Sequence, residues 1–280
     1  MAGGLTYRKE ITALQDSELA ALRDAYSQMM TMDASDNRSW VYWAGYHGFP
    51  RYDCWHHGIP GFGDQQPYDL FLPWHRAYLL YFDHTIRDRN PDAVLPWWDW
   101  TSKLSHTHGI PSQFADPSAN GATNSLASGP VPDIPAQAST GDPEIPAHNT
   151  LRFPGKPSKL PSAAKVKALL KLKDFVDFSK HVQDLHDQVH PWVGGIDPGP
   201  PKRFGDMGSI MTSAFDPIFW SHHCMIDRIW YLWQAQNGND SIPQIYLDRP
   251  LAPWALKVSD VLDIQQLGYE YAVSGITVHA

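Results

Sequence analysis

Histidines are the side chains of this chain whose number and spacing point most directly to chemistry, with 14 of them in 280 residues. Two of them, His186 and His190, stand four residues apart in the segment LHDQVH. On a helix this spacing puts both imidazoles on one face, one turn apart, where they can bind one metal ion. The pair alone is a weak signal, because surface histidines can share this spacing by chance.

A second pair, His222 and His223, lies inside the apolar stretch IFWSHHCMIDRIW. A histidine among buried aromatic side chains needs a partner for each ring nitrogen, because an unpaired buried polar group is costly. Either a metal ion or a hydrogen bond in the core can be that partner. Asp227, four residues after His223, is a candidate for a carboxylate that holds a metal-binding imidazole in place.

The N-terminal half contains a similar set of histidines. His47 ends one predicted helix, His75 lies near the start of the next, and His56 and His57 lie in the loop between them. Each half therefore offers about three histidines on helices or adjoining turns, without an obvious acidic cluster. Imidazole-only sites favour copper or zinc over calcium or magnesium. The spacing thus predicts a two-metal site and leaves the choice of metal, copper or zinc, open.

The elements that must position these histidines are predicted helices at 13–30, 40–47, 73–89, 162–190 and 216–236. Asp16 is the predicted N-cap of the first helix, and we expect a break near Asp174 in the fourth. The last helix begins at Asp216 and Pro217, because aspartate favours the N-cap and proline fits the first turn.

The middle of the chain, residues 105–165, holds ten prolines among serine, alanine, glycine and asparagine. This composition disfavours helices and central strands, so we expect a long surface excursion there. The tail, 243–280, is expected to form loops with a few short strands. We predict a single domain over 1–280.

The composition bounds the function. A net charge of −8 without a basic block argues against nucleic acid or an anionic membrane as the main partner. No apolar run reaches the ~18 residues that span a bilayer. Residues 1–10 lack the apolar stretch of a secretory signal, which predicts a cytoplasmic or already processed chain. Only Cys54 and Cys224 are present, so disulfides do not form the framework of this fold.

Three motifs resemble the copper-site signatures of the type 3 copper family, which comprises tyrosinases, catechol oxidases and molluscan hemocyanins. The motifs are FLPWHRAYL (71–79), LHDQVHPWVGG (185–195) and DPIFWSHHCMIDRIW (216–230). The resemblance implies two copper ions in a dinuclear site, with ligands His47, His75, His186, His190 and His223. It also implies that His222 is a packed neighbour of the site.

The middle ligand of the first site is the least determined. Some family members carry Cys-x-His with a thioether bond between the two side chains, and Cys54-Trp55-His56 is similar to that motif. The resemblance therefore favours His56 as the ligand, bonded to Cys54, and keeps His57 as the alternative.

Two further segments resemble the family. LGYEY (267–271) is similar to the tyrosine motif that closes the central domain in plant and fungal members, and Tyr7-Arg8 is similar to its usual partner region. The implied fold is mainly α, with a four-helix bundle carrying the copper site, long loops and a few short strands. The resemblance is to short bacterial and fungal forms without a C-terminal covering domain.

The family chemistry implied is oxidation of phenols and catechols to o-quinones with O2, including hydroxylation of monophenols. The alternatives are a catechol oxidase or o-aminophenol oxidase without that hydroxylation, and more remotely a hemocyanin-like O2 carrier. Asp187, directly after a predicted ligand, is the candidate base for deprotonating the phenol. Pro191 is expected to narrow the pocket rim. The sequence leaves open the physiological phenol, the oligomeric state and whether a copper-delivery partner exists.

Overall fold

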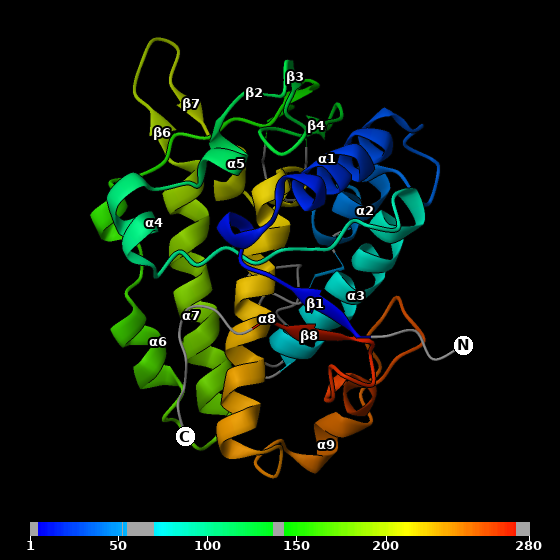
Figure 1. Cartoon of the computed structure of the whole chain (residues 1–280), viewed down its shortest axis with the longest axis vertical. Coiled ribbons are helices and arrows are strands. Elements are labelled where there is room, and N and C mark those ends of the chain that lie inside the picture. The colour runs from blue at the N-terminus through cyan, green and yellow to red at the C-terminus, as the bar shows by residue number, and fades with distance from the viewer. Residues whose placement is uncertain (1–4, 52, 55–69, 137–142, 273–280) are drawn as a thin grey trace.

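The computed structural model describes the chain at residues 5–51, 53–54, 70–136 and 143–272 (Figure 1). The helices that frame this part are α1 (Asp16–Thr31), α2 (Trp40–His47), α3 (Phe71–Arg89), α7 (Phe175–Gly194) and α8 (Pro217–Asn237). Figure 1 shows α7 and α8 running side by side through the molecule, with α3 across from them. The predicted mainly α fold with a helical core is confirmed. No helix of the described chain has both the length and the apolar character to cross a bilayer.

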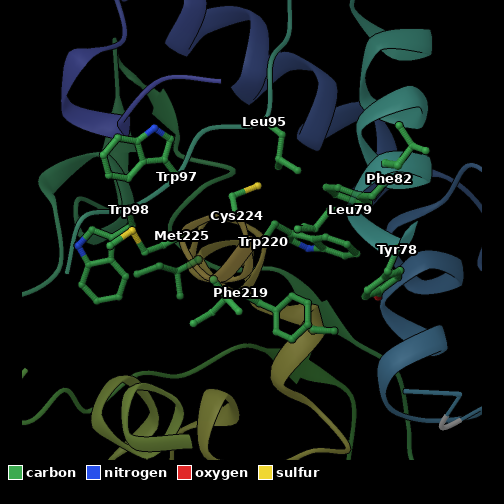
Figure 2. Close-up of a cluster of buried hydrophobic side chains, with 14 of the residues drawn as sticks. Tyr78, Leu79, Phe82, Leu95, Trp97, Trp98, Phe219, Trp220, Cys224 and Met225 are labelled. Atoms are coloured by element: carbon green, nitrogen blue, oxygen red, sulfur yellow. The ribbon is translucent and has the colours of Figure 1, made fainter. Parts of the chain in front are cut away.

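Aromatic side chains join the helices. On α8, Trp220 stacks on Phe82 of α3 with ring centroids 3.4 Å apart, and Trp233 stacks on Phe178 of α7 at 4.8 Å. Figure 2 shows Trp220, Phe82 and Tyr78 converging beside the buried thiol of Cys224. Burial of such large rings dominates the energy of a core, so these contacts fix α3 and α7 against α8.

The helix boundaries follow the signals in the sequence with one correction. Asp216 caps α8 by accepting a hydrogen bond from the Ile218 N–H. Asp174 is the N-cap of α7, and the predicted break near this residue separates α7 from α6 (Ala163–Leu169). The N-cap of α1 is Gln15 rather than Asp16, because the Gln15 N–H donates to the Glu18 carboxylate at 2.8 Å.

The expectation for residues 105–165 was only partly right. This segment contains short elements: α4 (Lys103–His108, which begins just before it), α5 (Ser112–Ala115), β2 (Ser118–Ala119), β3 (Ala122–Thr123), β4 (Pro130–Val131), β5 (His148–Asn149) and the 3-10 turn η3 (Pro157–Lys159). It also buries Phe114, Leu126 and Ile134 almost completely, so it is part of the core rather than a surface excursion. Prolines prevent long helices, but they do not stop the side chains between them from packing.

The C-terminal segment returns to the start of the chain. Strand β8 (Tyr269–Tyr271) pairs in parallel with β1 (Thr6–Arg8), so Arg8 lies opposite Tyr271. The remaining elements are β6 (Ile196–Asp197), β7 (Arg203–Phe204), α9 (Gln244–Leu247) and the 3-10 turns η1 (Ile11–Ala13), η4 (Asp206–Gly208), η5 (Ser213–Phe215) and η6 (Val258–Val261). The predicted association of the tyrosine segment with Tyr7-Arg8 is therefore present.

Candidate metal centre

Four helices bring their histidines to one place in the core. The described residues contain two groups whose potential ligand atoms lie within 4.8 Å of one another: His186, His190, His222 and His223 form one, and His47, His75 and His223 form the other. All of these side chains except His190 are buried, and His190 is half-buried. The structure thus collects predicted ligands from both halves of the sequence.

Three imidazoles of the first group converge through their Nε2 atoms. The His190 Nε2 lies 2.8 Å from that of His186 and 3.4 Å from that of His223, and the His186 and His223 Nε2 atoms are 3.2 Å apart. A neutral imidazole that donates through Nδ1 has only a lone pair on Nε2. Lone pairs facing each other at this distance repel, so a cation between them would relieve the contact.

The Nδ1 contacts specify that tautomer for His186 and His190, and for His75 of the other group. His190 Nδ1 lies 3.0 Å from the Met207 carbonyl oxygen, His75 Nδ1 lies 2.8 Å from that of Phe71, and His186 Nδ1 lies 3.0 Å from an Asp187 carboxylate oxygen. Each of these oxygens accepts the Nδ1 proton and leaves Nε2 as the acceptor. Such partners orient metal-binding histidines and raise their basicity.

Burial keeps these imidazoles neutral. It lowers the pKa of His75 to about 3 and that of His190 to about 4, and it holds the pKa of His223 well below the ordinary value. Neutral imidazole is the form that binds metals. A set of neutral nitrogen donors without carboxylates fits copper or zinc, so the residues present fit the copper pair that the sequence motifs imply.

Two expected features lie outside the described residues. His56 and His57, the two choices for the middle ligand of the first site, belong to segment 55–69, and the thioether bond between Cys54 and His56 depends on the same segment. Cys54 itself is buried, and burial raises the pKa of its thiol well above the ordinary value.

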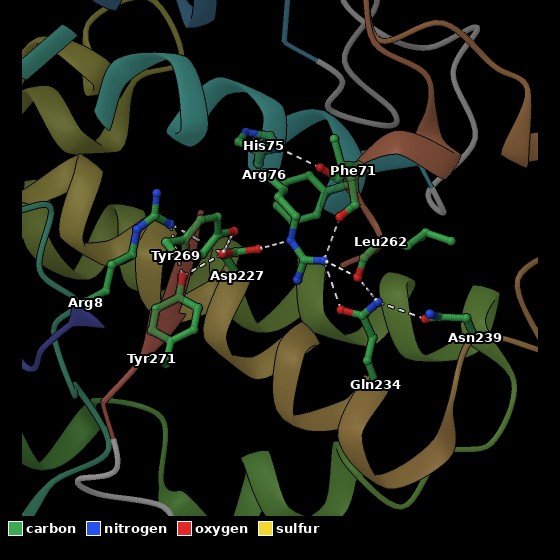
Figure 3. A network of polar contacts seen from close by, with 11 residues as sticks. Arg8, Phe71, His75, Arg76, Asp227, Gln234, Asn239, Leu262, Tyr269 and Tyr271 are labelled. Atoms are coloured by element: carbon green, nitrogen blue, oxygen red, sulfur yellow. Dashed lines mark hydrogen bonds and ion pairs between the residues drawn. The ribbon is translucent and has the colours of Figure 1, made fainter. Parts of the chain in front are cut away.

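The role predicted for Asp227 was wrong. Among the described residues its carboxylate contacts no histidine: it accepts hydrogen bonds from Arg76 Nε at 2.5 Å, Tyr269 at 2.8 Å and Tyr271 at 2.6 Å, and lies 3.5 Å from Arg8 Nη1 (Figure 3). Burial alone would raise the pKa of Asp227, but the two guanidinium groups outweigh it and the pKa lies below its ordinary value. A buried guanidinium group is charged and needs a counter-ion, whereas a neutral imidazole does not, so Asp227 pairs with the arginines.

The imidazoles open onto a cavity of about 320 Å³. Its lining includes His47, His186 and His190, and both Asp187 and Pro191 stand in its wall, Pro191 directly after His190. This volume is at the small end of the range for ligand sites, and it exceeds the ~150 Å³ in which an apolar cavity can hold benzene. One small aromatic molecule therefore fits beside the histidines.

Sequence reasoning missed two participants. Gln183 is buried, lines the same cavity, and lies three residues before His186 on α7, a helical spacing that would have identified it. The backbone carbonyl of Met207, which holds His190, has no counterpart in the side-chain pattern and could not have been identified that way.

Comparisons with known proteins agree with this geometry. The sequence model of the common central domain of tyrosinase matches residues 37–236. The chain is 29% identical over 215 residues to a tyrosinase from Streptomyces lincolnensis, covering 66% of this chain and 72% of that protein. It is 26% identical over 296 residues to an A-type hemocyanin from Enteroctopus dofleini, covering 96% of this chain but only 22% of the hemocyanin.

A solved structure shares the fold. The tyrosinase from Burkholderia thailandensis superposes with a TM-score of 0.80 at 23% sequence identity, covering 98% of this chain and 74% of that one. At this identity the likeness shows a common fold.

Proposed function

Because this chain belongs to the tyrosinase family, whose central domain matches residues 37–236, we propose that it oxidises phenols and catechols to o-quinones with O2 at a pair of copper ions. The finer part of the proposal is that it hydroxylates monophenols as well as oxidising catechols. The observation that carries the proposal is the cluster of neutral imidazoles facing a cavity of aromatic size, with a carboxylate in its wall.

In this proposal His186, His190 and His223 hold one copper ion, supported by the convergence of their Nε2 atoms. His222 is a packed neighbour: its ring stacks on His186 with centroids 5.1 Å apart, and neither of its nitrogens has a hydrogen-bond partner in the described chain. Its nitrogens make none of the 2.8–3.4 Å contacts that join the Nε2 atoms of the other three, although one of them lies within 4.8 Å of that set.

The other copper ion is held by His47 from the end of α2 and His75 from α3. The third ligand is His56, with His57 as the alternative. The copper pair supplies the redox chemistry with O2, for which protein side chains have no equivalent.

The protein's own residues bind and orient the phenol. The cavity wall formed by Pro191 and Ile210 offers apolar contact to the ring. A phenol loses its proton only near pH 10 in water, so a nearby base assists hydroxylation. Asp187 is the carboxylate of α7 in the cavity wall, and 55% of its side chain is exposed.

We expect Asp187→Asn to lower the rate of phenol hydroxylation about 10²-fold relative to catechol oxidation, which needs less help from a base. Asparagine keeps an oxygen that can accept from His186 Nδ1, so this variant separates proton transfer from orientation of the ring. Initial rates on tyramine and 4-methylcatechol give the ratio. Asp184→Asn, which changes an exposed carboxylate on the same helix away from the cavity, is the matched control. An unchanged ratio in Asp187→Asn would limit Asp187 to holding His186.

The match to hemocyanins makes reversible O2 binding the second candidate function. Copper content and O2 uptake separate the two. We expect two copper ions per chain and O2 uptake on both tyramine and 4-methylcatechol. Uptake on the catechol alone would make the protein a catechol oxidase, and reversible O2 binding without uptake on either would favour the carrier.

A further inference from the structure

A second cavity, of about 640 Å³, opens beside the histidine-lined one. The two cavities share Pro191, Gly208 and Ser209 in their walls, so they meet along one edge. The rest of the second cavity is lined by residues of strands β6 and β7 and by residues 153–155 of the proline-rich segment. A molecule seated at the imidazoles can therefore extend into this second space.

Backbone hydrogen bonds fix the walls of the second cavity. The Phe153 N–H donates to the Gly194 carbonyl at 2.7 Å, and the Gly205 N–H donates to that of Gly195 at 3.2 Å. Gly195 has a φ of +60°, and a Cβ on it would lie 1.7 Å from the Phe153 carbonyl oxygen. Only glycine permits this close approach, so the position of this wall depends on the glycine at 195.

The surface of this cavity is apolar and aromatic. Phe204 is 63% exposed and Ile196 is 49% exposed, and the half-buried Phe153 also lines the cavity. None of the described residues that line it has an ionisable side chain. Large apolar side chains left open to water beside a cavity are typical of a surface that a ligand covers.

The rim adds positive charge. Lys202 Nζ lies 4.9 Å from the centre of the Phe204 ring, and the Arg203 guanidinium lies 5.2 Å from that of Phe153. Arg203 is also paired with Asp197 at 2.5 Å, which leaves Lys202 as the cation of this hairpin that has no acidic partner among the described residues. A neutral or anionic ring suits this rim better than a cationic one.

We propose that the second cavity is a distal subsite for an aryl group joined to the phenol or catechol being oxidised. The inference rests on the proposed oxidase function and names its substrate class: two-ring phenols, with the reacting ring at the imidazoles and the second ring against Phe204 and Phe153. The shared edge at Gly208 connects the two positions. A Cβ on Gly208 would have the Pro191 Cα, at 3.9 Å, as its nearest neighbour, so the passage there is not closed.

The test compares kcat/KM for 4-benzylcatechol and 4-methylcatechol in the copper-loaded protein. We expect a preference of about 10-fold or more for the two-ring substrate, since burying one aromatic ring contributes about that factor in affinity. Phe204→Ala should abolish the preference through KM and leave kcat/KM for 4-methylcatechol unchanged. Phe204→Tyr keeps the ring and should keep the preference. Ile245→Ala, which truncates a 75% exposed side chain of α9, is the control.

A binding measurement separates failure of the subsite from failure of the oxidase proposal. The redox-inert 4-benzylbenzoate should bind to the parent about 10-fold more tightly than to Phe204→Ala by titration calorimetry. Oxidation of 4-methylcatechol with no two-ring preference, and equal binding of the analogue by both proteins, would overturn the subsite alone. Absence of oxidation with the expected difference in binding would overturn the oxidase function and retain an aryl-binding cavity.

Discussion

A His223→Ala variant is expected to bind at most one copper ion per chain and to lose at least about 10²-fold in catechol oxidation. His223 is the residue common to both histidine groups, and its ring also stacks on that of His75 with centroids 4.5 Å apart. Changes to residues that only support a ligand already cost 10- to 100-fold in metal affinity or activity, so loss of a ligand itself should exceed that. Copper per chain and O2 uptake on 4-methylcatechol measure the two effects.

Two other histidine variants make this result specific. His181→Ala removes an exposed imidazole from α7 and should keep both copper ions and full activity. His222→Ala should keep both copper ions as well, because the His222 nitrogens make none of the close contacts that join the Nε2 atoms of the other three. Loss of copper in His222→Ala, with retention in His223→Ala, would reverse the ligand assignment on α8.

An Asp227→Ala variant is expected to lose about 3–5 kcal/mol of unfolding free energy, because it leaves buried charges without a counter-ion. Arg8 and Arg76 are both fully buried, and Asp227 is the acid that they share. Two tyrosine hydroxyls would also lose their acceptor. For a chain of this size the loss corresponds to a fall in melting temperature of roughly 10 °C. Thermal unfolding of the copper-free protein measures it without contribution from the metal.

The control for this variant is another acid in an ion pair. Asp248 pairs with Lys257 at 3.0 Å, but both side chains are largely exposed, so Asp248→Ala should leave the melting temperature nearly unchanged. Asp227→Asn keeps the shape and removes the charge, and it should show most of the loss. If Asp227→Ala has the same melting temperature as the parent protein, another group must neutralise the charges of Arg8 and Arg76.

Local spacing predicted the parts of the site that a single helix determines. His186 and His190 share a face of α7 because four residues make about one turn, and Asp216 caps α8 because its side chain reaches the next free N–H groups. These relations depend only on neighbours in sequence. The same reasoning identified the predicted helices, although α3 begins at Phe71, two residues before the predicted start.

Spacing failed where partners come from distant segments. Asp227 stands one turn after His223, yet its oxygens are taken by Arg76 from α3 and by residues of β1 and β8. The acid that does contact one of the predicted ligands in the described chain is Asp187, which is adjacent in sequence to its partner His186. Asp227 pairs with the arginines because a buried cation needs a nearby anion. The sequence of α8 is apolar on nearly every side, so it did not show which face of the helix would meet those arginines.

The proline-rich segment shows a second limit. Its composition excluded long helices, but the close contact of its residues 153–155 with Gly194 and Gly195 depends on tertiary packing. Two adjacent glycines at the C-terminal end of α7 were visible in the sequence, and nothing there indicated that another backbone would lie against them. The second cavity therefore could not be predicted.

The pairing of β1 with β8 has a consequence for the order of events during synthesis. Arg8 and Tyr271 are 263 positions apart, and a chain leaves the ribosome from its N-terminus, so Arg8 must wait for nearly the whole described chain to be translated. The histidines of α8, His222 and His223, are translated 49 and 48 residues before Tyr271, as the sequence numbers show. A nascent chain thus carries every described histidine of the metal centre before Arg8 can meet its tyrosines. The contacts among Arg8, Asp227, Tyr269 and Tyr271 can therefore form only after residues 269–271 have been translated.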